Sequence, residues 1–374
     1  MKKMIDLFAG CGGLSLGMEN AGFEVEFANE INSSFFNTYL NNRKLTKDDY
    51  FVGDICELNK KIDYYSNKFK DLDLVCGGPP CQGFSMANRQ RVIDDPRNIL
   101  YRSFLQFLNF AKPKFFVMEN VKGMSKKIDE ILLDFERYLG TEYNLDHALI
   151  NAKNYGIPQN RERFFLIGNK LNINTKDVFK ALKKNYFKIN NFVLKDAIKD
   201  LPKLQPNRIK NKTKFESSEI GYYRVNYKYK KTAYYYYING NRTIKNLYNH
   251  RNRYNNDRDI EIFSILPQGE NSLHSSIKHI MPYKSRNHIF KDKYFKLDEN
   301  FVSKTITSHM KYDCNMYIHP TQARGISPRE AARVQTFPDD YVFSGAPNNW
   351  YAQIGNAVPV KLAEYLGNEI IKYL

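Results

Sequence analysis

The sequence has few cysteines and no long apolar run. Its five cysteines are widely spaced over 374 residues and form no CxxC pair, which argues against a disulfide framework or a structural zinc site and favours a reducing cytoplasm. Because no stretch of about 18 apolar residues occurs, we expect no membrane-spanning helix. An acid, Asp6, and a glycine-rich turn follow residues 1–5 too closely for a signal peptide. With 42% apolar residues, the chain can bury a core, which excludes wholesale disorder.

Acidic residues are scarce relative to basic ones. The chain has 40 Asp and Glu against 57 Lys and Arg, a formal net charge of +17. An excess of this size predicts a polyanionic partner, most simply a nucleic acid. Charge alone does not separate DNA from RNA, or either from an anionic membrane surface.

The positive excess is concentrated in residues 201–260, which contain 14 Lys and Arg against 4 acids, together with 10 of the 27 tyrosines. Basic side chains between aromatic ones suit a surface that binds phosphates and stacks on bases. The alternative is a compositional bias, since the whole chain is rich in Asn, Lys and Tyr. The candidate DNA contacts in this segment are Lys228, Lys230 and Lys231.

Short apolar runs alternate with helical patterns over the first ~190 residues, which predicts an α/β fold with a parallel sheet and crossover helices. Expected strands include 4–8, 24–28, 72–76, 115–118 and 164–167, and expected helices include 14–21, 99–111, 257–266 and 360–373. The last helix has a broad apolar face that we expect to pack on the N-terminal sheet. We therefore predict one domain formed by 1–193 and 353–374, and a second formed by 194–352.

A glycine-rich turn, Phe8-Ala9-Gly10-Cys11-Gly12-Gly13, connects the first strand to a helix. Glycines let the backbone approach a ligand closely, and such turns bind dinucleotides, phosphates or S-adenosylmethionine (SAM). The spacing is not GxGxxG, and no Walker lysine follows. Glu30, at the end of the second strand, is placed to bind a ribose diol, and Asp54 to accept from an adenine amine. Taken alone, such acids are usually solvated loop carboxylates.

A second motif, Gly78-Pro79-Pro80-Cys81-Gln82-Gly83-Phe84-Ser85, follows another strand. A lone intracellular cysteine is usually a small buried hydrophobe, but Cys81 follows a strand end and two prolines, at the edge where α/β sheets bind ligands. A thiol there can attack an electrophile. Glu119 ends another strand, and Arg161 and Arg163 are expected to face the same way just before a further one. A nucleophile, an acid and cations from three strand ends form a candidate active site.

These motifs resemble those of the C5-cytosine-specific DNA methyltransferases of bacterial restriction–modification systems. The matching segments are Asp6–Gly13, Pro79–Ser85, Glu119–Val121, Gln159–Arg163, Arg329–Pro338 and Gly355–Pro359, in the family's order. The resemblance implies a Rossmann-like SAM-dependent methyltransferase fold, with a mixed sheet, helices on both faces and a smaller target-recognition domain. It covers about 1–170 and 300–374, with the basic segment between them.

The resemblance also implies a mechanism. Cys81 would attack C6 of a cytosine flipped out of the duplex, so that C5 becomes nucleophilic enough to take a methyl group from SAM. Glu119 would bind N3 and the exocyclic amine, and Arg163 the O2 side, with Arg161 bracing the site. No metal is implied. The residue that removes the C5 proton is not assigned, and water is a candidate.

For the cofactor, the resemblance implies a SAM site that leaves S-adenosylhomocysteine as product. Its expected residues are Phe8, Gly10, Gly12, Gly13, Glu30, Ile31, Asp54, Ile55, Pro80, Asn356 and Val358. Ile31 stands where the family has an aromatic residue, so stacking on the cofactor is expected to be weaker. The segment 85–98 resembles the mobile loop that closes over DNA, with Ser85, Arg89, Arg91 and Arg97 as its candidate contacts. The segment Arg329–Pro338 is expected to frame the recognition domain without touching the base.

The partners implied are double-stranded DNA and a cognate restriction endonuclease, with a monomeric enzyme acting in the bacterial cytoplasm at the nucleoid. Two alternatives stay open. The tRNA-methylating branch of the family shares the catalytic motifs, although the large basic segment favours DNA. A catalytically silent DNA-binding regulator would be expected to have damaged motifs, whereas Cys81, Glu119, Arg161 and Arg163 are present. The target sequence cannot be read from the chain.

Overall fold

The computed structural model describes residues 2–80, 99–184, 191–210, 215–282 and 293–374. The chain divides into one unit formed by 1–155, 162–189 and 358–374, and a second formed by 156–161 and 190–357. Both chain ends belong to the first unit, as the final helix suggested. The units differ from the expected boundaries at 156–161, 190–193 and 353–357, which all join the second unit. One cause is strand β7 (Gln159–Asn160), which pairs in parallel with β11 (Ser303–Lys304).

Seven of the described strands form one mixed sheet in the first unit, in the order β3-β2-β1-β4-β5-β8-β6. Strands β1 to β5 run parallel, and β8 pairs antiparallel with β5 on one side and with β6 on the other. This confirms a methyltransferase-type mixed sheet. The strands are β1 (Lys2–Leu7), β2 (Phe23–Glu30), β3 (Tyr50–Val52), β4 (Leu74–Gly77), β5 (Phe115–Val121), β6 (Asn144–Asn151) and β8 (Glu162–Asn169).

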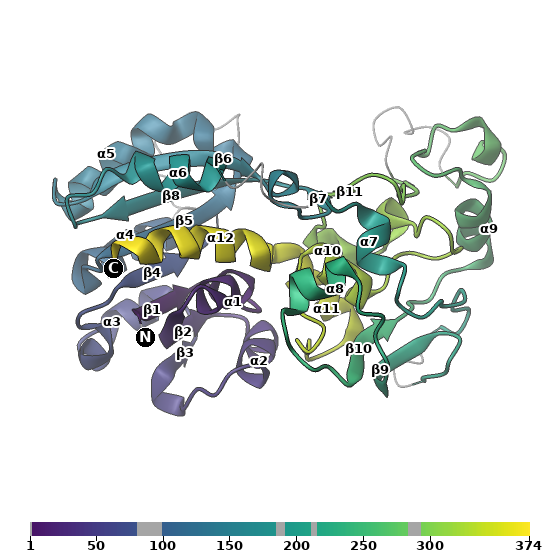
Figure 1. Ribbon diagram of the computed structural model, residues 1–374, viewed down its shortest axis with the longest axis horizontal. Helices are drawn as coiled ribbons and strands as arrows, with labels where there is room; N and C mark the ends of the chain where they lie inside the picture. The colour runs from purple at the N-terminus through teal and green to yellow at the C-terminus, as the bar shows by residue number, and fades with distance from the viewer. Residues whose placement is uncertain (1, 81–98, 185–190, 211–214, 283–292) are drawn as a thin grey trace. The chain divides into compact units, whose positions relative to one another are not determined.

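Helices cover both faces of this sheet. The helices of the first unit are α1 (Gly13–Asn20), α2 (Ser33–Asn41), α3 (Ile55–Lys60), α4 (Ile99–Ala111), α5 (Ile128–Leu139), α6 (Thr175–Lys184) and α12 (Val360–Ile370). Apolar residues of α3, α4 and α5 share one buried cluster with side chains of the strands. Figure 1 shows α1, α12 and α6 in front of the opposite face. The sheet is therefore buried on both sides, as expected for parallel strands.

The final helix α12 packs closely on α1. A Cβ placed on Gly17 of α1 would lie 2.4 Å from the Cβ of Ala363, and one on Gly367 of α12 would lie 2.8 Å from the Cβ of Ala21. The missing side chains let the two helix backbones approach each other. This contact fixes the C-terminal helix to the turn-and-helix segment at the start of the chain.

The second unit has less regular structure. Its elements are β7, β11, α7 (Leu194–Ile198), β9 (Gly221–Asn226), α8 (Ala233–Asn239), β10 (Asn246–Arg251), α9 (Asp257–Ile265), α10 (Pro328–Val334) and α11 (Pro347–Asn356). Strands β9 and β10 pair antiparallel. One apolar cluster is centred on α9, and another contains Tyr229, Tyr235 and Leu247.

The tyrosines of the basic segment do not all form a binding surface. Tyr229, Tyr234 and Tyr235 are at most 7% exposed, and the hydroxyl of Tyr234 donates to the backbone oxygen of Arg333 at 2.5 Å. Buried tyrosines contribute a large apolar area and place the hydroxyl on a partner. The prediction that this segment presents its tyrosines for stacking is therefore wrong for these three. In contrast, Lys228, Lys230 and Lys231 are exposed.

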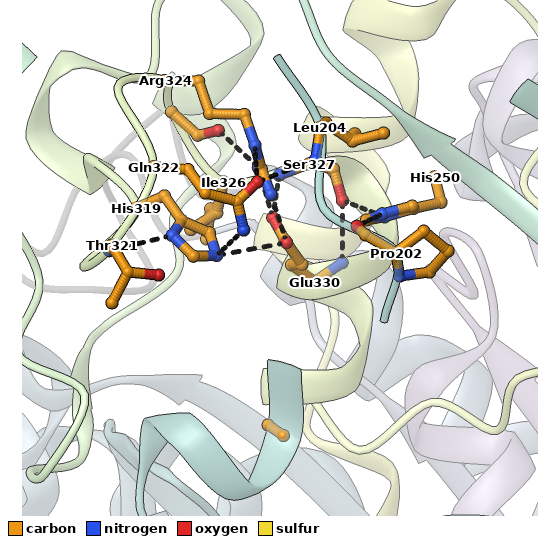
Figure 2. A network of polar contacts seen from close by, with 12 residues as sticks. Pro202, Leu204, His250, His319, Thr321, Gln322, Arg324, Ile326, Ser327 and Glu330 are labelled. Atoms are coloured by element: carbon orange, nitrogen blue, oxygen red, sulfur yellow. Dashed lines mark hydrogen bonds and ion pairs between the residues drawn. The ribbon is translucent and has the colours of Figure 1, made fainter. Parts of the chain in front are cut away.

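Helix α10 is buried along its whole length and begins at a capping box. Ser327 accepts from the backbone N–H of Glu330 at 3.2 Å, and the Glu330 carboxylate accepts from the N–H of Ser327 at 2.6 Å. The same carboxylate binds both terminal nitrogens of Arg324 at 2.7 Å (Figure 2). Nearby, Arg329 donates to three backbone oxygens. The segment 329–338 is thus a buried structural part of this unit, and its expected role in framing a recognition domain stays a prediction.

His250 joins this network as a buried neutral imidazole (Figure 2). Its Nε2 lies 2.8 Å from the carbonyl oxygen of Pro202 and must donate, so Nδ1 accepts from the Ser327 hydroxyl at 2.9 Å. Burial lowers the pKa of His250 from 6.5 to about 4. A histidine whose pKa is depressed by folding contributes stability above its unfolded pKa, and this contribution is lost as the pH falls toward the folded value.

We therefore expect the His250→Gln variant to lose less stability than the wild type between about pH 7 and pH 5. The difference should be about 2 kcal/mol, from linkage between pKa values of about 6.5 and 4. Urea unfolding can be followed by the fluorescence of the single tryptophan, Trp350, which is 3% exposed in the second unit. The difference between the two proteins removes the contributions of other titrating groups, which are the same in both. One such group is Asp6, because burial raises its pKa to about 6. Equal pH dependence in both proteins would refute a buried neutral His250.

Candidate active site

The carboxyl ends of β1 to β5 lie at one edge of the sheet, because these strands are parallel. Strand β8 is antiparallel to β5 and begins at the same edge, where Arg163 pairs with Val121. The sheet topology therefore brings together residues from the ends of several strands and from the start of β8. Ligands of open α/β sheets bind at this edge.

Glu119 and Arg163 form an ion pair at that edge. The Nε of Arg163 lies 3.0 Å from Oε1 of Glu119, and the side chains are only 18% and 13% exposed. Partial burial strengthens the attraction relative to a pair in water, and the remaining N–H groups of a guanidinium can bind another acceptor. The pair offers a ligand one acidic group and one cation side by side.

The segment that leads into Cys81 lies against this pair. The Nδ2 of Asn120 donates to the carbonyl oxygen of Pro79 at 2.8 Å, and a Cβ on Gly78 would lie 3.2 Å from Oε2 of Glu119. The absence of a side chain at Gly78 thus allows the chain to pass directly beside the carboxylate. Cys81 itself lies outside the described residues. Asn120 was present in a predicted motif, but its role in holding Pro79 was not foreseen.

Arg161 has different partners from Arg163. It is 1% exposed, and in the second unit it donates to the backbone oxygens of Ile306, Gly355 and Ala357 at 2.7 to 3.1 Å. The prediction grouped the two arginines as same-facing cations. The buried contacts of Arg161 tie the chain at 306 to the end of α11, and they are compatible with the bracing role that the resemblance implied for it.

The four described cysteines are poor nucleophiles. Cys11, Cys76 and Cys314 are at most 2% exposed, and burial raises the pKa of each thiol, that of Cys11 to about 12. Burial also raises the pKa of Cys56. Since the thiolate is the reactive form, the raised pKa values disfavour these four thiols as nucleophiles, including that of Cys56, which is partly buried and hydrogen-bonded with the Ser103 hydroxyl at 3.1 Å.

The glycine-rich turn after β1 has the open backbone that its sequence predicts. Gly10 has φ 57° and Gly12 has φ 86°, and Phe8 also adopts a positive φ of 55°. Among the described residues, apart from the neighbours of Gly10 in the chain, no atom lies within 4 Å of the position that a Cβ on Gly10 would occupy. A left-handed backbone is uncommon for a bulky residue such as phenylalanine and tends to mark functional sites.

Glu30 closes this turn from the end of β2. Its Oε2 accepts from the backbone N–H of Gly10 and its Oε1 from that of Asn32, both at 2.8 Å. Burial raises the pKa of Glu30, and the N–H groups of Asn32 and Gly10 oppose that rise. Each carboxylate oxygen has a second lone pair for another donor. Glu30 can therefore hold the turn and bind a ligand hydroxyl at the same time.

Arg43, which the sequence analysis did not single out, supports the turn from behind. Its side chain is 5% exposed and paired with Glu19 at 2.6 Å. It also donates to the carbonyl oxygen of Gly12 at 3.3 Å and to the hydroxyl of Ser15 at 3.2 Å, and its guanidinium lies 3.9 Å above the Tyr39 ring. A Cβ on Gly12 would lie 2.6 Å from Nη1 of Arg43. The glycine is needed because the guanidinium occupies that space.

Asn29 is a second residue that the sequence did not reveal. Its Nδ2 donates to the carbonyl oxygens of Phe51 and Gly53, both at 2.9 Å, and so joins the ends of β2 and β3. Asp54 follows directly and caps α3 by accepting from the N–H of Cys56 at 2.8 Å. Ile55 is 1% exposed, so its backbone rather than its side chain is what can face a ligand.

The other predicted cofactor residues are distributed over both units. Ile31 is 63% exposed beside Glu30, and Val358 is 5% exposed in the first unit. Pro80 is exposed, as is Asn356, which ends α11 in the second unit. The predicted DNA contacts Ser85, Arg89, Arg91 and Arg97 lie outside the described residues.

No helix in the described part of the chain is long and apolar enough to cross a membrane. Within the same residues, no group of three or more His, Cys, Asp or Glu side chains is arranged to hold a metal ion.

The chain is similar to a protein family, to curated proteins and to solved structures. Residues 2–372 match the family model described as C-5 cytosine-specific DNA methylase. The Type II methyltransferase M.DdeI of Desulfomicrobium norvegicum is 32% identical over 99% of this chain and 88% of its own length. M.MthTI of Methanothermobacter thermautotrophicus is 31% identical over 98% and 96%. A crystal structure titled as a prophage-encoded DNA modification methyltransferase from E. coli has a TM-score of 0.75 at 28% identity, covering 100% of this chain and 99% of that one.

Proposed function

The chain belongs to the C-5 cytosine-specific DNA methylases, and from that membership we propose that Cys81 forms a covalent bond to C6 of a flipped-out cytosine in a specific duplex sequence, allowing C5 to be methylated from SAM. The observation that carries this proposal is the Glu119–Arg163 pair, 3.0 Å apart at the carboxyl end of β5. The chain that enters Cys81 passes directly beside it.

The chemistry requires these groups together. C5 of an aromatic cytosine is a weak nucleophile, and attack of the Cys81 thiolate on C6 converts the ring to an enamine-like system. Glu119 binds N3 and the exocyclic amine and supplies a proton as negative charge builds in the ring. Arg163 stabilises the same charge from the O2 side. After methylation, loss of the C5 proton and release of Cys81 restore the aromatic ring. The raised thiol pKa values of the four described cysteines favour Cys81 as the nucleophile.

The residues around the glycine-rich turn fit SAM. Glu30 retains acceptor capacity for the ribose hydroxyls, and open space lies in front of Gly10. The exposed side chains of Ile31 and Val52, 63% and 42% exposed, offer an apolar surface at the ends of β2 and β3 for a purine ring. We assign Phe8, Gly12, Gly13, Asp54, Ile55, Pro80 and Val358 of the first unit to the same site, and the role of Asn356 stays an expectation from the resemblance. SAM supplies the electrophilic methyl group.

Because Arg43 holds the turn from behind, we expect Arg43→Leu to raise the KM for SAM about 10-fold. Loss of charged hydrogen bonds is worth about 1.5 to 3 kcal/mol, and about 1.4 kcal/mol corresponds to a 10-fold change in affinity. kcat at saturating SAM should change less than the KM, since Arg43 does not contact the reacting atoms. The Lys180→Leu variant is a control, because Lys180 forms an exposed pair with Asp177 in the same unit. Equal KM values for the two variants would contradict the positioning role.

The names of the relatives suggest a biological role for the methylation. M.DdeI and M.MthTI are named as Type II methyltransferases, so we assign this chain the role of protecting host DNA against a cognate endonuclease. The protein would act on duplex DNA as a monomer, and its second unit would recognise the target sequence. Its exposed Lys228, Lys230 and Lys231 are candidate phosphate contacts.

Incubation with labelled SAM and mixed-sequence duplex DNA tests the proposal. We expect label in 5-methylcytosine with the wild type and none with Cys81→Ser. Transfer should be greater to duplex DNA than to tRNA. The proposal fails if no 5-methylcytosine forms, if Cys81→Ser matches the wild type, or if tRNA is the preferred acceptor. Bisulfite sequencing of DNA from cells expressing the gene would then identify the target sequence.

A further inference from the structure

A pocket of about 280 Å³ opens in the second unit, and Lys228, Lys230 and Lys231 are not among the residues that line it. Its walls come from four places: residues 207–210, residues 251–254 at the end of β10 and just beyond it, the first turn of α10 and the first turns of α11. The chain at Asn207 is joined to that at Tyr254 by a parallel bridge. Two of the four walls are therefore fixed to each other.

Three cations line this pocket: Lys210, Arg251 and Arg253. Arg253 is held in place, because its two terminal nitrogens donate to the backbone oxygens of Met310 and Tyr312 at 2.7 Å. Those partners are neutral and orient the guanidinium, while the carboxylate of Asp313 also interacts with Arg253 and that of Glu216 with Arg251. Lys210 lies 6.0 Å from the centre of the Tyr254 ring and is exposed at the pocket.

The rest of the lining adds to the positive potential. None of the described residues that line the pocket is acidic. Helix α11 begins there with Pro347 and Asn348, and its N-cap residue, Ala346, makes no side-chain capping bond. The N-terminus of a helix carries a partial positive charge and attracts anions. A cavity, three cations and the helix N-terminus therefore favour the same kind of ligand.

We propose that this pocket binds a backbone phosphate of the DNA substrate. The proposal rests on the proposed function, because it gives the second unit a fixed anchor on the duplex. Phosphate contacts position a protein on DNA without reading its sequence, so the pocket contributes affinity and register rather than specificity. A free phosphate or a mononucleotide has the same chemistry, and the experiment must distinguish these sources.

The test measures DNA binding by fluorescence anisotropy, using a labelled mixed-sequence duplex over a series of salt concentrations. Lys210→Gln removes one exposed cation, and Asn348→Asp places a carboxylate at the pocket. An acid in the first turn of a helix favours the helix, so this second variant should fold. Loss of one phosphate contact lowers the slope of log K against log salt by about 0.9, which corresponds to about 8-fold weaker binding at about 0.1 M salt.

Lys195→Gln is the matched control. It removes the same charge from a half-buried lysine of the same unit whose ammonium group makes an exposed hydrogen bond to Asn300 and does not line the pocket. We expect its salt slope to equal that of the wild type, and the dissociation constant for SAM to be the same in all variants. Identical slopes for Lys210→Gln, Asn348→Asp and Lys195→Gln would overturn the proposal, even if the wild type methylates DNA.

A second experiment, with inorganic phosphate and with a mononucleotide, tests whether the pocket binds a free anion. If either stabilises the wild type against heat at millimolar concentration but not Lys210→Gln, while DNA binding is equal in both, the pocket takes a free anion and the DNA assignment is wrong. If the wild type makes no 5-methylcytosine, the proposed function fails, and that result is separate from the salt slopes.

Discussion

Replacing Glu119 with glutamine is expected to lower kcat for methyl transfer about 1,000-fold, within the range that positioned acid–base groups contribute. Glutamine has nearly the same shape and retains an oxygen that can accept from Arg163, whose Nε lies 3.0 Å from Oε1 of Glu119. Its amide has no acidic proton to transfer to N3. The affinity for SAM should be unchanged, because Glu119 is not among the residues assigned to the SAM site.

Glu162→Gln is the control for this variant. Glu162 begins the same strand as Arg163, but it is 38% exposed and pairs with the exposed Lys122 at 2.7 Å. Single-turnover rates with saturating SAM and DNA isolate the chemical step. A Glu119→Gln enzyme whose rate stays within threefold of the Glu162→Gln enzyme would remove Glu119 from the mechanism.

The Arg333→Met variant is expected to be destabilised by about 3 to 5 kcal/mol, because it leaves buried carboxylates without their cation. The fully buried Arg333 binds both oxygens of Asp339 at 2.7 and 2.8 Å and an oxygen of Asp200 at 2.6 Å. The guanidinium holds the pKa of Asp339 below its usual value. Helix α10 is anchored through this contact to the segments before and after it.

The matched control is Arg242→Met, since Arg242 pairs at 3.0 Å with Asp340, the neighbour of Asp339 in the sequence. Its side chain is 38% exposed and that of Asp340 46%, and such surface pairs contribute at most about 1 kcal/mol. Urea unfolding followed by Trp350 fluorescence gives both values. Equal destabilisation of the two variants would show that burial does not set the strength of the Arg333 contacts.

Local signals in the sequence predicted much of the first unit. The apolar spacing from Ile99 to Ala111 predicted a helix with those bounds, and the apolar run 115–118 predicted the buried start of β5. Each of these features depends on neighbouring residues. Strand β6 was missed because its side chains are mostly half-buried at the edge of the sheet, so it has no clear alternation of apolar and polar residues.

The residues that support the site were harder to predict. Arg43 follows a polar stretch that is typical of a solvated loop, yet it packs behind a glycine 31 positions earlier. Asn29 looks like a strand-end polar residue, and its role depends on β3 lying next to β2. Tyrosine is amphipathic, so composition alone could not show that Tyr229, Tyr234 and Tyr235 lie in the core. All of these roles arise from contacts between distant parts of the chain.

The most direct test of the account uses duplex DNA in which the target cytosine is replaced by 5-fluorocytosine. The fluorine cannot leave as a proton, so after methyl transfer the enzyme should stay bonded to C6 in an adduct that survives denaturation. Peptide mass spectrometry is expected to locate the adduct on Cys81. An adduct on Cys11, Cys56, Cys76 or Cys314, or none under conditions in which ordinary DNA is methylated, would contradict the mechanism proposed here.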